Sequence, residues 1–280
     1  PAFAPRAGLD ARDGELVEAE HSGPKRLGLP RARITARLGD PMGPRAVSLI
    51  AIHQHGIPDR FPDAVLAQAD AALPAPMGKR DDLRDLPLVT IDPSDARDHD
   101  DAVYAEHDTD PKNPGGFVVW VAIADVAHYV RPGSPLDREA RKRGNSTYFP
   151  DRVVPMLPDV LSGDLCSLHE GVDRPCIAVR MKLDAEGQKI SHRFVRGMMC
   201  SAASLHYGEV QDAADGRPND RTAPLMDRVI APLYAAYAAA TRARHLRQPL
   251  DLDLPERKIV LSDDGTVLSV AFRDRLDAHK

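Results

Sequence analysis

Hydrophobic and polar positions along the chain follow two periods, and these predict most of its strands and helices. Short apolar runs rich in β-branched residues and bounded by Gly, Pro or Asp predict strands. Apolar positions that recur every three or four residues predict helices. The predicted strands span residues 15–20, 31–38, 88–91, 102–104, 117–126, 176–183, 189–199, 258–261 and 267–272, and the predicted helices span residues 45–55, 62–73 and 222–246.

Two of these elements carry more specific expectations. Residues 117–126 form a nearly continuous apolar run after Gly115 and Gly116, which predicts a strand buried on both faces. Residues 222–246 present an apolar stripe that includes Leu225 and Val229, and Pro232 should kink this helix. Residues 154–167 predict a loop with a short helix. The chain therefore mixes helices with strands, several of them paired as hairpins.

The composition is that of an ordinary soluble globular protein. With 280 residues, the chain can form one large or two smaller domains with proper cores. Hydrophobic residues make up 42% and charged residues 28%, and no apolar run approaches the length of a membrane span. The first residues lack the pattern of a signal peptide, and the missing initiator Met suggests a fragment or a trimmed sequence.

The cysteines and a histidine pair give no sign of a structural metal or a disulfide framework. Cys166, Cys176 and Cys200 are odd in number and none lies in a C-x-x-C pair, which favours reduced thiols in a cytoplasmic protein. His53 and His55 lie two apart on a predicted helix, so their side chains diverge. We expect these histidines to be structural.

Basic residues gather near the N-terminus although the net charge is −5. Residues 21–39 contain no acid, and Arg31, Arg33 and Arg37 give the strand at 31–38 a basic face. Such a face suits contacts with phosphates. A charge-protected edge strand explains it equally well.

Acidic residues are concentrated after the strand at 88–91. Residues 92–101 contain five aspartates and no glutamate, where the average of 42 acids in 280 positions gives one or two. These aspartates are Asp92, Asp95, Asp98, Asp100 and Asp101. Carboxylates this close repel one another unless they share a cation, and oxygen ligands suit Mg²⁺ or Mn²⁺. The loop therefore predicts a metal site, with a solvated acidic loop as the alternative.

An EF-hand calcium loop does not fit this segment. Counted from Asp92 or from Asp98, the twelfth position is Val103 or Thr109, so the required Glu is missing. A second candidate segment, residues 142–150, combines basic, flexible and aromatic residues. Its Tyr148 can stack on a base or fill a core.

Several stretches together resemble one family, the ribonuclease II and ribonuclease R exoribonucleases. They are TIDPSDARDHDDAV (90–103), VAIADVAHYV (121–130), GNSTYFPDRVVPMLPDVLSGDLCSL (144–168), DRPCIAVRM (173–181) and LDLPERKIVL (252–261). Their length, order and spacing are far more specific than a single short motif. The ribonuclease R branch is the more similar.

This resemblance implies an α+β fold, in which an RNB-type catalytic domain follows the end of an OB or cold-shock β-barrel. Residues 1–40 would complete that RNA-binding barrel, residues 41–85 would form a helical linker, and residues 86–280 would be the N-terminal part of the RNB domain. The implied protein is a cytoplasmic monomer with no membrane association. It would bind the 3′ end of single-stranded RNA.

The resemblance also assigns the site. Asp92, Asp98 and Asp101 would hold Mg²⁺, with Mn²⁺ as the alternative, and Asp100 would be the residue most directly needed for the chemical step. Tyr148 matches the aromatic residue that packs on the terminal nucleotide. The implied activity is processive 3′→5′ hydrolysis to nucleoside 5′-monophosphates by metal-assisted attack of water.

Two departures from the family qualify this expectation. Ser204 stands where the family usually carries a basic residue, which puts a contact at that position in doubt. The sequence ends at Lys280, before a serine-proline-isoleucine-arginine-arginine segment whose arginine neutralises charge on the phosphoryl group. We therefore expect the 280 residues alone to be inactive. An RNA-binding module without catalysis, a regulatory fragment and a metal-dependent DNA nuclease are the rival hypotheses.

Overall fold

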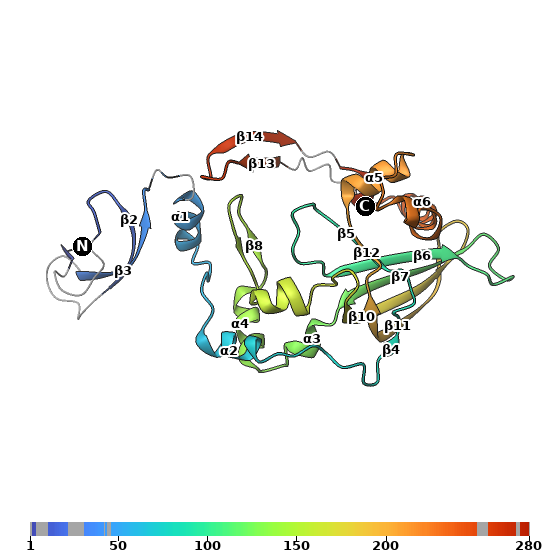
Figure 1. Ribbon diagram of the computed structural model, residues 1–280, viewed down its shortest axis with the longest axis horizontal. Coiled ribbons are helices and arrows are strands. Elements are labelled where there is room, and N and C mark those ends of the chain that lie inside the picture. The colour runs from blue at the N-terminus through green and yellow to red at the C-terminus, as the bar shows by residue number, and fades with distance from the viewer. Residues whose placement is uncertain are drawn as a thin grey trace. The chain divides into compact units, whose positions relative to one another are not determined.

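The computed structural model describes residues 2–3, 11–21, 31–41, 43, 46–250, 257–272 and 275–279 (Figure 1). The chain divides into two compact units. The smaller unit comprises residues 1–60, 145–154 and 255–273, and the larger unit comprises residues 61–144, 155–254 and 274–280. Neither unit is continuous in sequence. The boundaries expected near residues 40 and 85 separate the barrel, the linker and the RNB domain, and they stay a prediction.

In its described residues, the smaller unit consists of short sheets and helix α1. Strands β1 (Ala2–Phe3), β3 (Arg31–Gly39) and β2 (Leu16–His21) form one sheet, in that order. Strands β8 (Thr147–Tyr148) and β9 (Val153–Val154) pair with each other, as do β13 (Arg257–Leu261) and β14 (Val267–Phe272). Helix α1 (Ala46–Gln54) is joined to the β8–β9 segment by a hydrogen bond from Ser48 to Asp151.

The larger unit is organised around a seven-stranded sheet (Figure 1). Its strand order is β12 (Ala203–His206), β5 (Val89–Asp92), β6 (Asp101–His107), β7 (Phe117–Ala124), β10 (Asp173–Leu183), β11 (Lys189–Cys200) and β4 (Asp81–Asp82). The two outermost pairs, β12–β5 and β11–β4, are parallel, and the others are antiparallel. The strands predicted at 102–104, 117–126 and 176–183 thus form the centre of the sheet.

Helices cover the two faces of this sheet because successive side chains of a strand point to opposite faces. Ala102 and Ala122 pack in one core with residues of α2 (Asp63–Asp70), α4 (Pro135–Arg143) and a π-helical turn (Val160–Leu165). Helix α3 (Val126–Tyr129) directly follows β7 and adds Tyr129 to this core. The mixed helices and sheet confirm the α+β class that the family resemblance implied.

The opposite face packs on the C-terminal helices. Val89 and Leu205 form a core with Val210 of α5 (Tyr207–Ala214) and Val229, and Ala105 and Phe117 form another with α6 (Ala231–Leu246). A 3₁₀ turn (Ala223–Leu225) and a π-helical turn (Met226–Ile230) precede α6, and a last 3₁₀ turn spans Asp277–His279. These elements fix the position of β12 beside β5.

Two expectations about these elements are wrong in part. Residues 117–126 do not form a strand buried on both faces, because β7 ends at Ala124 and Ile123 is 45% exposed. Residues 223–246 are helical throughout but do not form one regular helix, because a 3₁₀ turn and a π-helical turn precede α6. Pro232 lies in the first turn of α6, directly after the π-helical turn.

Two findings on the described residues bear on exclusions made from sequence. No helix in the described part of the chain is long and apolar enough to cross a membrane. The three cysteines are free, and Cys166 and Cys176 are buried in the core of the larger unit.

Candidate active site: the aspartate loop

The aspartate loop, residues 92–101, connects two neighbouring strands of the larger unit. Asp92 is the last residue of β5 and is buried, and Asp101 is the first residue of β6 and is exposed. Asp98 and Asp100 lie in the loop between them and are exposed. Because β5 and β6 are neighbouring antiparallel strands, the end of β5 and the start of β6 lie side by side, and so do the two ends of the loop. The four predicted carboxylates therefore lie on this loop and at its two ends.

Main-chain hydrogen bonds hold this loop in place. The Oγ of Ser167 accepts a hydrogen bond from the N–H of His99 at 3.0 Å and donates to the carbonyl of Arg97 at 3.3 Å. The N–H of Leu168 donates to the carbonyl of His99 at 2.7 Å, and the N–H of Ala124 donates to that of Asp100 at 2.9 Å. The segment after the π-helical turn and the end of β7 thus fix the loop backbone.

We predict that Ser167→Ala loosens the aspartate loop. Ser167 is fully buried, and its removal leaves the N–H of His99 without its acceptor. A buried donor left unsatisfied costs about 1–3 kcal/mol, so the free energy of unfolding should fall by that amount. Amide hydrogen exchange of residues 97–101 should accelerate.

Ser162→Ala is the matched control for this prediction. The Oγ of Ser162 reaches the carbonyls of Leu157 and Pro158, both at the long distance of 3.4 Å. Its loss should change the free energy of unfolding by less than about 0.5 kcal/mol. Equal effects of the two substitutions on loop exchange would show that Ser167 does not position the loop.

His99 orients Asp92, a role that sequence reasoning missed. Its Nδ1 lies 2.6 Å from Oδ2 of Asp92, and both side chains are largely buried. The edge of the His99 ring also faces His169, with the ring centroids 6.3 Å apart. A histidine between two aspartates of an acidic loop was a visible signal. Its partner could be identified only once the loop had folded.

The carboxylates of the loop interact electrostatically. Partial loss of water around its carboxyl raises the pKa of Asp100, although the residue is exposed, and the charges of Asp98 and Asp92 raise it further. The same cause raises the pKa of Asp101, with further contributions from Asp100 and Asp92. A cation shared by the loop would remove this repulsion.

The donor set of the loop fits a hard divalent cation. Carboxylate oxygens are the ligands that Mg²⁺ and Mn²⁺ prefer. Within the described ranges, no three His, Cys, Asp or Glu side chains are gathered closely enough to hold a metal ion, and one oxygen of Asp92 faces His99. The chemistry of the donors therefore fits the metal. The assignment of Asp92, Asp98 and Asp101 as its ligands stays a prediction.

The second strand beside the site is β12, which pairs in parallel with β5. His206 is in register with Asp92, and Ser204 is in register with Thr90. At Ser204, where the family resemblance had led us to expect a basic side chain, the guanidinium of Arg221 donates a hydrogen bond to the main-chain carbonyl at 2.5 Å. A cationic group thus reaches position 204 from a distant loop.

The other predicted RNA-binding residues lie in the smaller unit. Tyr148 is on β8, and the residue is 65% exposed. Arg31, Arg33 and Arg37 are exposed on β3, as a basic strand face requires. However, Arg33 pairs with Glu20 at 3.4 Å and Arg37 pairs with Glu15 at 2.8 Å, so part of this positive charge is offset. Their contacts with RNA stay a prediction.

Comparisons with known sequences point to one family. Residues 80–280 match the RNB domain family, and residues 2–62 match the cold shock domain family. Ribonuclease R of Escherichia coli (strain K12) is 41% identical over 280 residues, which cover 97% of this chain and 34% of the relative. Ribonuclease R of Acidithiobacillus ferrooxidans is 43% identical over 252 residues, covering 87% of this chain and 56% of the relative. The chain thus spans only part of the length of these relatives.

Solved structures give the same fold. The RNase R of Mycoplasma genitalium, solved in complex with ribose methylated single-stranded RNA, superposes with a TM-score of 0.85 at 26% identity. The match covers 99% of this chain and 43% of that one. Yeast Ssd1, described as a pseudonuclease, superposes with a TM-score of 0.63 at 16% identity, over 95% of this chain and 33% of that one. That second likeness shows the fold alone.

Proposed function

The chain belongs to the RNB domain family and resembles its ribonucleases R. From this premise we propose that it is part of a 3′→5′ exoribonuclease and contains the acidic half of the active site. The substrate would be single-stranded RNA, which the protein would bind at its 3′ end. The products would be nucleoside 5′-monophosphates, released processively. A protein described as a pseudonuclease has the same fold, so the fold alone does not argue for catalysis. The observation that carries the proposal is the aspartate loop, which presents four carboxylates between β5 and β6.

In the proposed reaction, a water oxygen attacks the terminal phosphorus, and the bond from phosphorus to the 3′ oxygen of the preceding nucleotide breaks. The water loses a proton and the leaving 3′ oxygen gains one. When bound, Mg²⁺ or Mn²⁺ would withdraw charge from the phosphate and lower the pKa of the attacking water. Asp92, Asp98 and Asp101 would hold this ion.

The chain's own residues have separate tasks in this proposal. Asp100 accepts a hydrogen bond from the attacking water and directs it at phosphorus. His99 keeps the carboxylate of Asp92 in one orientation through its 2.6 Å contact. Tyr148, an exposed residue, packs on the terminal base. Because the chain spans 34% of the length of one ribonuclease R relative, the complete activity is proposed for the longer protein.

The proposal predicts stepwise shortening of RNA from its 3′ end. The 280-residue chain, and the same chain continued to the length of its ribonuclease R relatives, should be incubated with RNA labelled at its 5′ end. In Mg²⁺ we expect a descending ladder and nucleoside 5′-monophosphates for the longer chain only. EDTA should stop the reaction, since the carboxylates cannot activate water without the metal. Gel electrophoresis and chromatography of the released nucleotides measure both results.

Three outcomes would contradict the proposal. Internal fragments would indicate an endonuclease, and equal shortening of DNA of the same sequence would indicate a nuclease without selection for RNA. RNA that is bound but not shortened in Mg²⁺ or Mn²⁺ would indicate a binding module without catalysis. Shortening by the 280-residue chain alone would contradict only the proposed need for the longer protein.

A further inference from the structure

We propose that Arg221 binds a backbone phosphate of the RNA beside the aspartate loop, and that Glu170 occupies Arg221 when no RNA is bound. This inference rests on the proposed function, because it assumes an RNA strand at the loop. It assigns a phosphate contact to a residue for which sequence reasoning gave no role.

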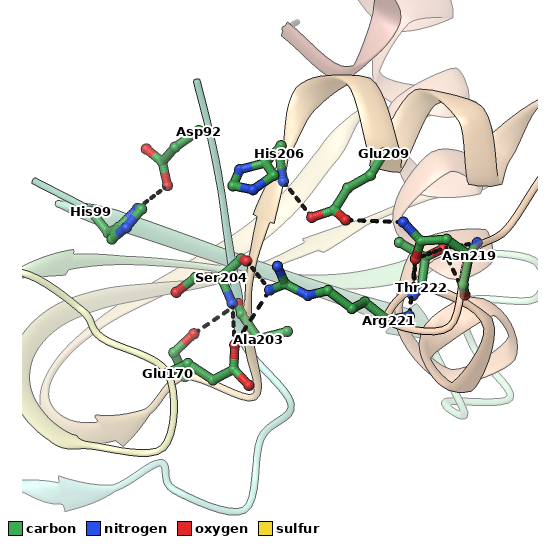
Figure 2. A network of polar contacts seen from close by, with 11 residues as sticks. Asp92, His99, Glu170, Ala203, Ser204, His206, Glu209, Asn219, Arg221 and Thr222 are labelled. Carbon is green, nitrogen blue, oxygen red and sulfur yellow. Dashed lines mark hydrogen bonds and ion pairs between the residues drawn. The ribbon is translucent and has the colours of Figure 1, made fainter. Parts of the chain in front are cut away.

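The first observation is that side chains satisfy main-chain groups on the open side of β12, the edge strand of the sheet. Strand β12 is the outermost strand on its side, so one row of its main-chain groups lacks a neighbouring strand. At Ser204 the N–H donates to Oε2 of Glu170 at 3.1 Å, and the carbonyl accepts from Arg221 at 2.5 Å. Two side chains of opposite charge therefore meet at one residue of the edge, as Figure 2 shows.

The second observation is the rigid support of Arg221. The N–H groups of Arg221 and Thr222 both donate to Oδ1 of Asn219, at 3.0 and 2.9 Å. The Nδ2 of Asn219 donates to Glu209 at 3.2 Å, and Glu209 also accepts the N–H of His206 at 2.9 Å. Thr222 is fully buried. The backbone of Arg221 is thus tied to β12.

This support places the guanidinium on the open side of β12, the strand next to the one that ends at Asp92. His206, which shares Glu209 with the Arg221 loop, is in register with Asp92 on the adjacent strand. Ser204 lies two residues earlier, which is about 6.6 Å along a strand. In Figure 2, Asp92 and His99 lie to the left of His206, and the guanidinium of Arg221 reaches Ser204. An RNA strand whose phosphate meets the aspartate loop would therefore pass close to Arg221.

The third observation is that the Arg221–Glu170 pair is loose. The ion pair measures 3.6 Å, and the two side chains are 49% and 54% exposed. A guanidinium has five N–H donors, and the hydrogen bond to Ser204 uses only part of them. Exposed ion pairs contribute little to stability, whereas arginine binds phosphate through two parallel hydrogen bonds. A phosphate can therefore replace Glu170 at small cost.

Charge gives the reason for such a contact. The aspartate loop carries five aspartates within ten residues and repels the phosphates of RNA. Two other arginines of the larger unit are held by shorter ion pairs, Arg196 by the buried Asp125 at 2.7 Å and Arg174 by Asp164 at 2.6 Å. Arg221 combines exposure, a fixed backbone and a weakly held partner.

The test uses the chain continued to the length of its ribonuclease R relatives and measures its affinity for fluorescent single-stranded RNA, in EDTA to prevent cleavage and at several salt concentrations. Arg221→Gln should weaken binding about 5- to 30-fold, since a charge-assisted phosphate contact is lost. The slope of log affinity against log salt should become shallower by about 0.7, the value for one phosphate of a single strand. Glu170→Gln should instead tighten binding, because it releases Arg221. The variant Arg221→Lys should recover part of the loss.

The matched control is Arg217→Gln. Arg217 lies in the same loop and is also exposed, but it pairs with both Asp212 and Asp215. Binding close to that of wild type for this control supports the proposal. Equal weakening by Arg217→Gln and Arg221→Gln, or weakening by Glu170→Gln, would overturn it while leaving the proposed function intact. If this longer wild-type protein binds no RNA, both proposals are overturned, and thermal melting of each variant identifies loss by unfolding.

Discussion

Replacing Asp125 by Asn is expected to lower the free energy of unfolding of the larger unit by about 3–5 kcal/mol, the usual cost of breaking a buried ion pair. The side chain of Asp125 is 1% exposed, and its Oδ2 lies 2.7 Å from both Arg80 and Arg196. Arg80 is itself only 8% exposed, so a neutral amide in place of the carboxylate would leave a buried cation without its counter-ion. Urea unfolding at pH 7 measures the loss.

Asp212→Asn is the control for this stability prediction. Asp212 is also paired with an arginine, Arg217, but both side chains are more than half exposed. An exposed pair of this kind contributes about 0–1 kcal/mol. Similar losses for the two substitutions would contradict the structural importance of the buried pair.

The effect of Asp125→Asn should also depend on pH. Burial raises the pKa of Asp125, but hydrogen bonds from Arg196 and Arg80 lower it by more, so the net pKa lies below the usual range. The group therefore contributes its full stability above the unfolded pKa of about 3.9 and loses it as the pH falls through the lower folded value. The difference in unfolding free energy between wild type and variant should shrink below about pH 4. A difference that stays constant in acid would contradict this ion-pair account.

The ion pairs of Asp125 with Arg80 and Arg196 also connect to the candidate site. Asp125 directly follows Ala124, whose N–H holds the carbonyl of Asp100. Arg196 lies on β11 and Arg80 directly precedes β4, so the buried pair joins three segments at the end of β7. Stability and the position of the aspartate loop therefore depend on the same group of contacts.

Local patterns were enough to predict the central strands and the long hairpin. The runs at 176–183 and 189–199 flank the turn at residues 184–187, and β10 and β11 pair there from Asp173 to Cys200. Helix α4 was also predictable, although we did not predict it. Ser134 caps it by accepting the N–H of Asp137, Pro135 opens it, and Gly144 ends it with a positive φ of 79°.

Long-range contacts could not be predicted in this way. Strand β12 has only four residues and is held by parallel pairing with β5, more than a hundred positions earlier in sequence. The contacts of Ser167 with the aspartate loop, and of Arg221 with Ser204, likewise join segments that no periodicity relates. The family resemblance supplied the four aspartates. The residues that position them came from the folded structure.

Replacing Asp100 by Asn is expected to slow RNA shortening by about 10²- to 10⁴-fold, the usual contribution of a group that moves a proton in the chemical step. Asn keeps the size of the side chain but cannot accept the proton of the attacking water as a carboxylate does. RNA should bind at least as tightly as to wild type, because a negative charge beside the phosphate is removed. Asp95→Asn is the matched control, since Asp95 is an exposed turn residue of the same loop.

The most direct test of the catalytic role of the aspartate loop is a single-turnover measurement on the chain continued to the length of its ribonuclease R relatives. Saturating wild type, Asp100→Asn and Asp95→Asn proteins are each mixed with 5′-labelled RNA, and Mg²⁺ starts the reaction. We predict a wild-type rate for Asp95→Asn and a loss of at least about 10²-fold for Asp100→Asn, with RNA bound throughout. Equal rates for Asp100→Asn and Asp95→Asn on fully bound RNA would contradict the assignment of the aspartate loop as the active site.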